Sequence, residues 1–350
     1  MSSGFDRSAR SGMAVSVPES SPKDEECAPR PGIIFIGGVG RSGSTLTEIV
    51  LSNHDEIMSL GELSTALSHS LQHCACGQLV RQCPFWSDLL QEACETYGFA
   101  SLDRLAPLVR RYMHILALPS SACGRTGGLG DRARYLTFVE ALGRIACARA
   151  GARWLVDSSK NLNLAVLYRR RFRERLKVVH LTRHPLGVLS SYMKDFDRGF
   201  GFRFFKGRLN VKSRVARAAL VTLTWNLYNF GFWLLRRLFP TSVYHQRYED
   251  ILAEPRASLE ELGSFLGASF EEVIQRIERG EDIVIGHTMA GNVMRMADSR
   301  RLRVDPRQAV PPRARWAMKM LVAVLGFPTW WLTGYGMRRR CRVPRPPGKY

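Results

Sequence analysis

Apolar and polar positions along this chain form blocks that predict strands followed by helices. A continuous apolar run at residues 33–36 predicts a buried strand, followed by a glycine-rich turn and a helix that starts near Gly43. Three more strand candidates, at 154–157, 176–182 and 242–248, are each followed by a polar turn. Strands that alternate with helices through short turns predict an α/β fold with a mainly parallel sheet. Ligands of such sheets bind at the carboxyl ends of the strands, where these polar turns fall.

One domain is predicted from residue 32 to residue 340. Residues 1–31 lack an apolar run of signal-peptide length and are expected to form a disordered tail, and 341–350 are expected to form a basic C-terminal tail. The uncharged stretches 218–235 and 320–337 are interrupted by polar residues or by Gly-Phe-Pro, which predicts buried or interfacial helices rather than membrane spans. Eight cysteines in 350 residues do not indicate a disulfide scaffold, so a cytoplasmic location is expected.

The charge balance is strongly basic. Lys and Arg number 51 against 31 Asp and Glu, which gives a formal net charge of +20. Such a field favours anionic partners: nucleotides, acidic glycans, nucleic acid or an anionic membrane surface. The acid-free segment 198–217 could form an acceptor-facing lip, a contact for single-stranded nucleic acid or a solvated loop, and with the basic run 338–342 it could form a peripheral membrane anchor.

The loop between the first strand and helix has the composition of an anion nest. In Gly40-Arg-Ser-Gly-Ser-Thr45, consecutive backbone N–H groups and the helix N-terminus converge on one point. Ser44 stands where an ATP-binding P-loop would have its lysine. A kinase would also need a metal-binding carboxylate, for which Asp157 is the only candidate at a neighbouring strand end. A glycine-rich turn that binds nothing is the simpler alternative.

With further segments, this loop resembles the sulfotransferases that use 3′-phosphoadenosine-5′-phosphosulfate (PAPS). In that family the loop holds the 5′-phosphosulfate, with a Lys or Arg where Arg41 stands. A strand, an arginine and a serine eight residues later hold the 3′-phosphate, a pattern that Arg183 and Ser191 meet. The segments 154–160, 247–250 and 286–295 are also similar to family members, so the resemblance spans residues 32 to about 336.

The resemblance implies a P-loop-type three-layer sandwich with a mainly parallel central sheet flanked by helices. It implies transfer of a sulfuryl group from PAPS to a hydroxyl or amine, with release of 3′-phosphoadenosine 5′-phosphate (PAP) and without a metal. Arg41 and Lys160 would stabilise charge, and Glu62 would be the base, with His180 and His184 as reserves. The implied nucleotide-binding residues are Arg41, Ser42, Gly43, Ser44, Thr45, Arg183, Ser191, Tyr248, Gly291, Asn292 and Arg295.

The cysteine-bearing segment allows several interpretations. Cys74, Cys76 and Cys83 could ligate zinc with His73, or could form a strained or redox-active pair. Because Cys-x-Cys is a tight spacing for a tetrahedral site, ordinary reduced thiols are favoured and no metal site is expected.

The expected partner is an acceptor substrate, which could be an acidic glycan, a lipid or a protein. No stable nucleic-acid partner is expected, peripheral membrane contact is allowed, and the oligomeric state stays open. Two rival hypotheses are a P-loop nucleotide kinase and a basic nucleic-acid- or membrane-binding protein on an inactive nucleotide fold.

Overall fold

The computed structural model describes residues 30–68, 73–97, 129–197, 213–291, 293–296, 301–309 and 316–335. The chain divides into two units, residues 1–30 and 31–350, and every described residue except Arg30 lies in the second. Residues 1–29 of the predicted N-terminal tail and the whole predicted C-terminal tail lie outside the described residues, as do Asn292, most of the acid-free segment and the run 338–342.

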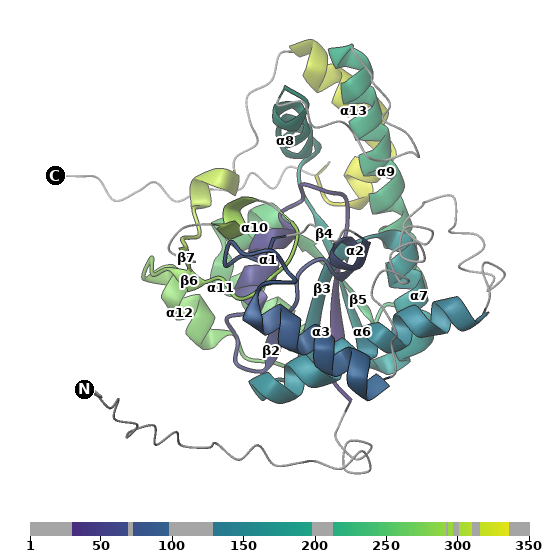
Figure 1. Ribbon diagram of the computed structural model, residues 1–350. Helices are drawn as coiled ribbons and strands as arrows, with labels where there is room; N and C mark the ends of the chain where they lie inside the picture. The colour runs from purple at the N-terminus through teal and green to yellow at the C-terminus, as the bar shows by residue number, and fades with distance from the viewer. Residues whose placement is uncertain are drawn as a thin grey trace, which may run out of the picture. The chain divides into compact units, whose positions relative to one another are not determined.

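The central sheet has five parallel strands in the order β2-β3-β1-β4-β5 (Figure 1). The strands are β1 (Gly32–Gly37), β2 (Ile57–Ser59), β3 (Trp154–Lys160), β4 (Leu176–Thr182) and β5 (Val243–Arg247). Four of them lie where the hydrophobic pattern predicts strands, and the edge strand β2 was not predicted. A pair of two-residue strands, β6 (Ile283–Val284) and β7 (Arg301–Leu302), runs antiparallel outside this sheet.

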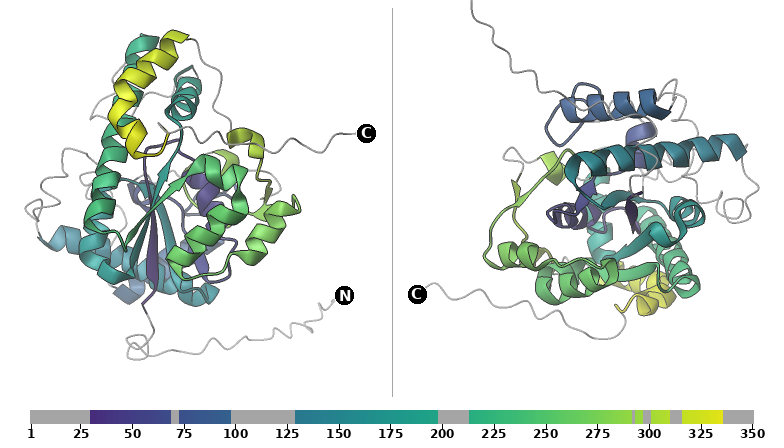
Figure 2. Two further views of the ribbon diagram at one scale, coloured as in Figure 1. Left: turned by 180° about the vertical axis from the view of Figure 1, so that it is seen from behind. Right: turned by 90° about the horizontal axis from the view of Figure 1, so that it is seen from below.

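Helices lie on both sides of the sheet, which confirms the predicted three-layer α/β architecture (Figure 2). One side carries α1 (Ser44–Leu51), α10 (Tyr248–Ala253), α11 (Pro255–Leu266) and α12 (Glu271–Glu278). The core on the other side includes residues of α2 (Leu63–Ser68), α3 (Pro84–Tyr97), α6 (Leu129–Ala150), α7 (Leu162–Phe172), α8 (Pro185–Asp197), α9 (Arg214–Leu238) and α13 (Trp316–Leu332). Single turns of 3₁₀-helix occupy Arg173–Arg175, Val293–Met296 and Pro306–Ala309.

Successive residues of β1 pack alternately into two separate hydrophobic cores. Ile33 and Phe35 pack with the α3, α6, α7 and α9 side, whereas Ile34 and Ile36 pack with the α1, α11 and α12 side. A parallel strand buried on both faces needs apolar residues at every position, which explains the continuous run. Within the described part of the chain, no helix is both long and apolar enough to cross a membrane.

Strand β3 contains an irregularity where it reaches the loop after β1. Phe35 pairs with Asp157, but Gly37 pairs with Lys160, so β3 has one more residue than β1 over this stretch. Such a bulge redirects the side chains that follow it. Lys160 itself has φ of 65°, a left-handed conformation uncommon for a non-glycine residue and typical of functional sites.

Candidate active site

The loop between β1 and α1 has the backbone geometry of an anion nest. Arg41 and Gly43 have φ of 68° and 96°, and Gly43 directly precedes the first turn of α1. The N–H groups of this turn have no partner within the helix, so they and the helix dipole favour a bound anion. A side chain at Gly43 would meet the ring of Tyr248 at 2.0 Å, so the position also requires glycine for space.

One side chain of the loop supports the fit of an oxyanion. Ser42 is almost completely buried, and its Oγ has no hydrogen-bond partner in the described structure. A buried hydroxyl without a partner costs about 1–3 kcal/mol, which a bound anion would offset by accepting from it. Ser44 and Thr45 are buried beside it at the start of α1.

Arg183 is held against this loop although 142 positions separate it from Arg41. Its Nη1 donates to the carbonyl oxygen of Arg41 at 3.2 Å, and its guanidinium lies 4.5 Å from the centre of the Tyr248 ring. The same ring lies against Gly43. Tyr248 therefore lies between the loop and Arg183, and it joins the two elements that the sequence predicted to bind opposite ends of the nucleotide.

Ser191 lies on α8, eight residues after Arg183. A Cβ at Gly187 would lie 2.9 Å from Nε of Arg183, so the first turn of α8 passes directly beneath this side chain. Ser191 is one turn beyond Gly187 and half-buried, on the same face of the helix. The geometry fits the predicted pairing of a charge from Arg183 with a hydroxyl from Ser191.

The two histidines that were alternatives to Glu62 as the base make hydrogen bonds within the fold. His180 is buried in β4, where its Nε2 lies 3.0 Å from Oδ1 of Asn229 and burial lowers its pKa to about 4. His184 accepts at Nδ1 from the backbone N–H of Leu186, and burial lowers its pKa to about 4 as well. Both imidazoles pack against neighbouring side chains, and Glu62 stays the predicted base.

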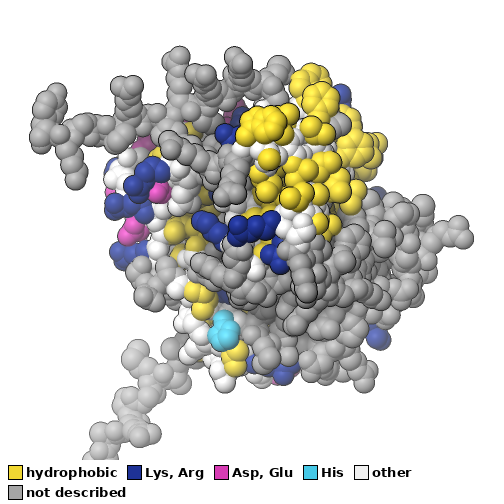
Figure 3. All heavy atoms as spheres, turned by 90° about the horizontal axis from the view of Figure 1, so that it is seen from above, with side chains coloured by type: hydrophobic (Ala, Val, Ile, Leu, Met, Phe, Trp, Pro, Cys, Tyr) yellow, Lys and Arg dark blue, Asp and Glu magenta, His cyan; other side chains and the backbone are white. Residues whose placement is uncertain are grey.

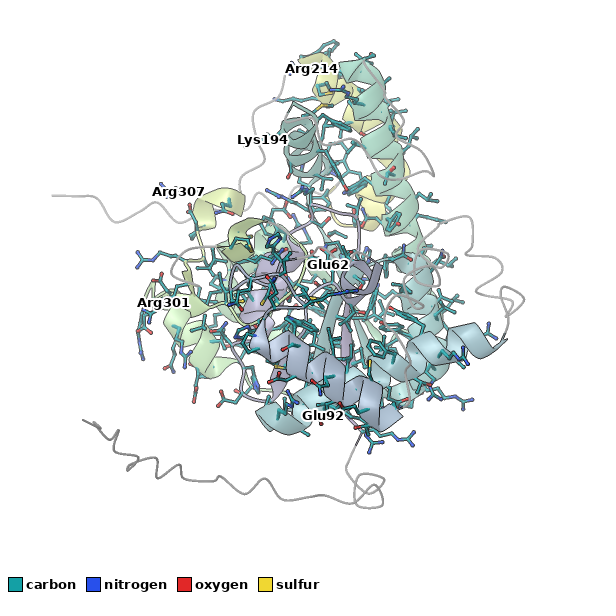
Figure 4. All side chains as sticks on the ribbon, in the orientation of Figure 1. Glu62, Glu92, Lys194, Arg214, Arg301 and Arg307 are labelled. Carbon is teal, nitrogen blue, oxygen red and sulfur yellow. The ribbon has the colours of Figure 1, made fainter. Side chains whose placement is uncertain are left out.

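Lys160 and Glu62 form an ion pair at the carboxyl edge of the sheet, where Figure 4 shows Glu62 beside α2. The second oxygen of Glu62 accepts from Oγ1 of Thr65 at 3.0 Å. Both charged side chains remain partly accessible, at 16% for Lys160 and 14% for Glu62. A Cβ at Gly291 would lie 2.8 Å from Oγ1 of Thr45 and 3.6 Å from Oε1 of Glu62, so this pair adjoins the end of the nest. Both residues were predicted from the sequence as parts of the site, but the ion pair between them was not.

A second carboxylate, Glu48 of α1, lies buried beneath this pair and was not predicted. Ser158 donates to it at 2.6 Å and Ser59 at 2.9 Å. Burial raises the pKa of Glu48 to about 7, against the opposing effects of these two hydrogen bonds and of Lys160. Nothing in the sequence marks this Glu, because a helix carboxylate is ordinarily solvated, whereas all eight residues of α1 are buried.

The raised pKa of Glu48 predicts a pH-dependent stability difference. The folded state keeps the Glu48 proton up to about pH 7, while the unfolded state loses it near 4.5, so stability falls as pH rises between these values. We expect Glu48→Gln to gain about 2–3 kcal/mol in unfolding free energy relative to wild type between pH 5 and pH 8. Urea denaturation at both pH values measures this, with Glu272→Gln on the exposed face of α12 as the control. Parallel pH dependence in Glu48→Gln and wild type would contradict the assignment.

Asp157, the candidate metal ligand of a kinase, has its oxygens engaged inside the protein. One oxygen accepts from the hydroxyl and N–H of Ser159 and from the N–H of Leu63, and the other accepts from the Tyr168 hydroxyl at 2.7 Å. The residue is fully buried, and burial raises its pKa to about 6. This carboxylate therefore fastens the end of β3 and is not presented to a ligand.

Arg295 contacts the cysteine-bearing segment. Its Nη1 donates to the carbonyl oxygen of His73 at 2.8 Å, and its buried Nε has no hydrogen-bond partner within the described residues. Burial lowers the pKa of Arg295. A role of Arg295 in nucleotide binding stays a prediction, and Asn292 lies outside the described residues.

The protein thus has a P-loop-type α/β fold with an anion nest, an arginine held against that nest and a Lys–Glu pair. Residues 129–272 match the model of the sulfotransferase family, which confirms the resemblance to sulfotransferases and supports sulfuryl transfer as the general class of activity. Lys160, Arg183, Ser191 and Tyr248 lie within this segment. The nest and Glu62 precede it and are joined to it by the contacts above.

Three solved structures to which this chain is similar are sulfotransferases or sulfotransferase domains. The sulfotransferase domain of the Synechococcus PCC 7002 olefin synthase has 19% identity and a TM-score of 0.43, over 86% of this chain and 97% of that one. The sulfotransferase domain from the curacin biosynthetic pathway has 18% identity and a TM-score of 0.45, over 86% and 99%. Sulfotransferase STF9 from Mycobacterium avium has 12% identity and a TM-score of 0.44, over 73% and 69%. No curated protein sequence matches significantly.

Proposed function

We propose that this protein transfers a sulfuryl group from PAPS to a hydroxyl or amine acceptor and releases PAP. The main support is that Tyr248 lies against both the nest and Arg183. The nest and Arg183 are also in direct contact, and the Lys160–Glu62 pair lies beside them. In this proposal the nest and Arg183 form two neighbouring anion-binding positions of one site. A nucleotide with a 5′-phosphosulfate and a separate 3′-phosphate has the matching distribution of charge.

In this proposal the chain's residues divide between the two ends of the donor. The nest, the Ser42 hydroxyl and Arg41 hold the 5′-phosphosulfate, and Arg183 with Ser191 holds the 3′-phosphate. Lys160 supplies positive charge to the oxygens that become more negative as the bond to sulfur breaks. Its position beside the nest puts that charge where a leaving phosphate would need it.

The chemical step is an in-line displacement at sulfur. The acceptor oxygen or nitrogen forms a bond to sulfur while the bond from sulfur to the 5′-phosphate oxygen breaks, and that oxygen leaves with the electron pair as part of PAP. Glu62 takes the acceptor's proton, for which Lys160 and Thr65 orient its carboxylate. The sulfuryl group is not reduced or oxidised, and the proton is the only additional product.

A P-loop kinase is the second enzyme hypothesis, and two features disfavour it. Ser44 occupies the position of the P-loop lysine. The only carboxylate proposed for magnesium, Asp157, is fully hydrogen-bonded inside the protein.

The acceptor itself is not specified by these residues, because fold and donor site do not determine it. We place the reaction in the cytoplasm.

Calorimetric titration with PAP and, separately, with ATP and Mg²⁺ tests the proposal. We expect micromolar PAP binding, about −8 kcal/mol, and much weaker ATP binding because ATP lacks a 3′-phosphate. Arg183→Ala should weaken PAP binding by about 10- to 100-fold, since a hydrogen bond to a charged group contributes about 1.5–3 kcal/mol.

The matched control is Arg237→Ala, which removes another arginine that stacks on an aromatic ring, Trp233 on α9. Its PAP affinity should stay within about twofold of wild type, well below the tenfold effect of 1.4 kcal/mol. Equal affinity for ATP and PAP, or an Arg183→Ala variant that binds PAP like wild type, would overturn the donor assignment and favour the kinase.

A further inference from the structure

Three cysteines and one histidine from distant parts of the chain converge outside the proposed donor site. Cys74, Cys76 and Cys83 precede α3, and His287 lies more than 200 positions further along. Their potential ligand atoms all lie within 4.8 Å of one another. The histidine differs from the one expected, because His73 is exposed and is not part of this group.

The distances in this cluster match those between the ligands of a tetrahedral zinc ion. Nδ1 of His287 lies 3.5 Å from Sγ of Cys74 and 3.3 Å from Sγ of Cys83. With Zn–S near 2.3 Å and Zn–N near 2.0–2.1 Å, tetrahedral geometry requires an S···N separation of about 3.6 Å. These two distances fit such a site, and the Sγ of Cys76 lies within 4.8 Å of the other three ligand atoms.

The backbone conformation explains how two cysteines separated by a single residue can both face one metal site. Cys74 and Cys76 contact one hydrophobic core, while Ala75 between them belongs to the other, so both sulfurs face the same side. Gly77, with φ of 91°, then turns the chain back, and Cys74 and Gln78 are joined by a backbone hydrogen bond of 2.9 Å. This turn brings the chain round toward Cys83.

His287 is oriented by the residues that directly follow Cys83. The ring of Phe85 stacks on the imidazole at 5.1 Å between centroids, and Nε1 of Trp86 donates to the His287 carbonyl oxygen at 2.9 Å. The stacking restrains the imidazole ring, and the hydrogen bond restrains the backbone of His287. The Cys-Pro-Phe-Trp sequence thus supplies one ligand and the two contacts that position another.

We propose that Cys74, Cys76, Cys83 and His287 bind a structural Zn²⁺ ion. Three thiols and an imidazole form a closed ligand set of the kind zinc prefers, which leaves no position for substrate. On binding, the three thiols release their protons to solvent and no electrons are transferred. This site departs from the expectation of free thiols without a metal.

The ion would also fasten a loop of the proposed active site. Met289, two residues after His287, forms backbone bridges with both Gly61 and Cys74, and Glu62 donates its N–H to the Met289 carbonyl at 3.0 Å. Gly291 lies against Thr45 and Glu62. Metal loss should therefore loosen the segment 286–291 beside the Lys160–Glu62 pair as well as lower stability.

Metal analysis of the full chain, purified from zinc-supplemented cells without chelators, tests this proposal. We expect about one Zn²⁺ per chain, bound tightly enough that chelation lowers Tm. Cys76→Ser and His287→Ala should each lose most of the metal. The matched control is Cys94→Ser on α3, a cysteine outside the cluster, which should retain the full content.

Cobalt substitution of the wild-type chain covers the case in which a ligand variant fails to fold. Co²⁺ in the site should give thiolate-to-metal charge-transfer absorption and the intense visible bands of tetrahedral coordination. Three outcomes would each overturn the proposal: less than about a tenth of an equivalent of zinc after reconstitution, octahedral cobalt spectra, or a disulfide among Cys74, Cys76 and Cys83 in protein kept under reducing conditions.

A separate observation concerns the outer faces of α9 and α13, which pack on each other. Leu223, Leu227, Phe230 and Leu234 form an exposed stripe along α9, and Trp316, Met320, Val324, Phe327 and Trp331 form another along α13. Figure 3 shows hydrophobic side chains gathered in one large patch on this part of the molecule. Large apolar patches on a soluble surface indicate an interaction site.

Basic residues accompany these two stripes. Arg214 at the start of α9, Arg237 near its end and Lys319 on α13 are exposed, and Figure 4 shows Arg214 and Lys194 at the same end of the helices. Aromatic and aliphatic side chains flanked by cations suit the interface of an anionic bilayer. We infer that this face binds an anionic membrane surface peripherally, in keeping with the net charge of +20.

Vesicle co-sedimentation tests this second inference. Wild type should bind phosphatidylglycerol-containing vesicles, bind phosphatidylcholine alone much less, and release at high salt. Leu227→Ser with Phe327→Ser, at 49% and 69% exposure, should lower binding at least about fivefold, whereas Val284→Ser, 54% exposed on β6, should not. Absence of binding, or a wild-type dimer in light scattering that the double variant converts to monomer, would overturn it.

Discussion

Replacing Glu62 by Gln is expected to lower the rate of sulfuryl transfer by about 10²–10⁴-fold at saturating PAPS. The amide keeps the shape of the carboxylate but cannot accept the acceptor's proton. PAP affinity should change little, because in our proposal Glu62 faces the acceptor rather than the nucleotide. PAP release in the presence of an acceptor extract measures the rate, and calorimetry measures the affinity.

The control for this variant is Glu56→Gln, six residues earlier in the same segment. Glu56 forms an exposed ion pair with Arg153 at 2.9 Å, so the substitution removes the same charge from a pair outside the site. Its rate should stay close to wild type. A Glu62→Gln variant that retains more than about a tenth of the wild-type rate would exclude Glu62 as the base.

Replacing Lys160 by Met should lower the transfer rate by about 10²–10³-fold, the usual cost of losing one charge-stabilising group. Met approximates the length of the side chain and removes its charge, while Lys160→Arg keeps the charge and should recover part of the rate. The rates are compared at saturating PAPS, so that a change in affinity does not contribute. Turnover of Lys160→Met at the wild-type level would remove Lys160 from the mechanism.

Because Lys160 and Glu62 contact each other, their effects should not add. The double variant is expected to lose less than the product of the two single losses, as neighbouring groups that act together do. Strict additivity would mean that the ion pair in the structure has no part in the transition state.

The strands were predictable wherever burial left a clear pattern. β1 and β4 are covered on both sides by helices. The apolar run at 33–36 indicated β1, and the apolar residues of β4 on both faces indicated that strand although Lys177 and His180 interrupt them. β2 was missed because it has only three residues, Ile57–Ser59, too few for any period to appear. Tyr248 was predicted to end a strand but begins α10, where Glu249 and Asp250 in the first turn favour a helix.

The site was predictable where a local motif carries the chemistry and not where it depends on long-range contacts. The loop and Arg183 follow strands and Lys160 ends one, so all three could be located from sequence. The burial of Glu48 depends on Ser59 and Ser158 from two other strands. His287 joins the cysteines only through the folded chain, so sequence proximity suggested His73 instead.

Sulfuryl transfer from PAPS is measured most directly by incubating sulfur-labelled PAPS with the purified protein and an extract of hydroxyl- and amine-bearing acceptors, without added metal. We predict that PAP forms in equal amount to a labelled sulfate ester or sulfamate, and that Glu62→Gln lowers the rate of both by at least about 10²-fold. Bound PAPS that yields no transferred label, or transfer of phosphate from ATP instead, would contradict the proposed sulfuryl transfer.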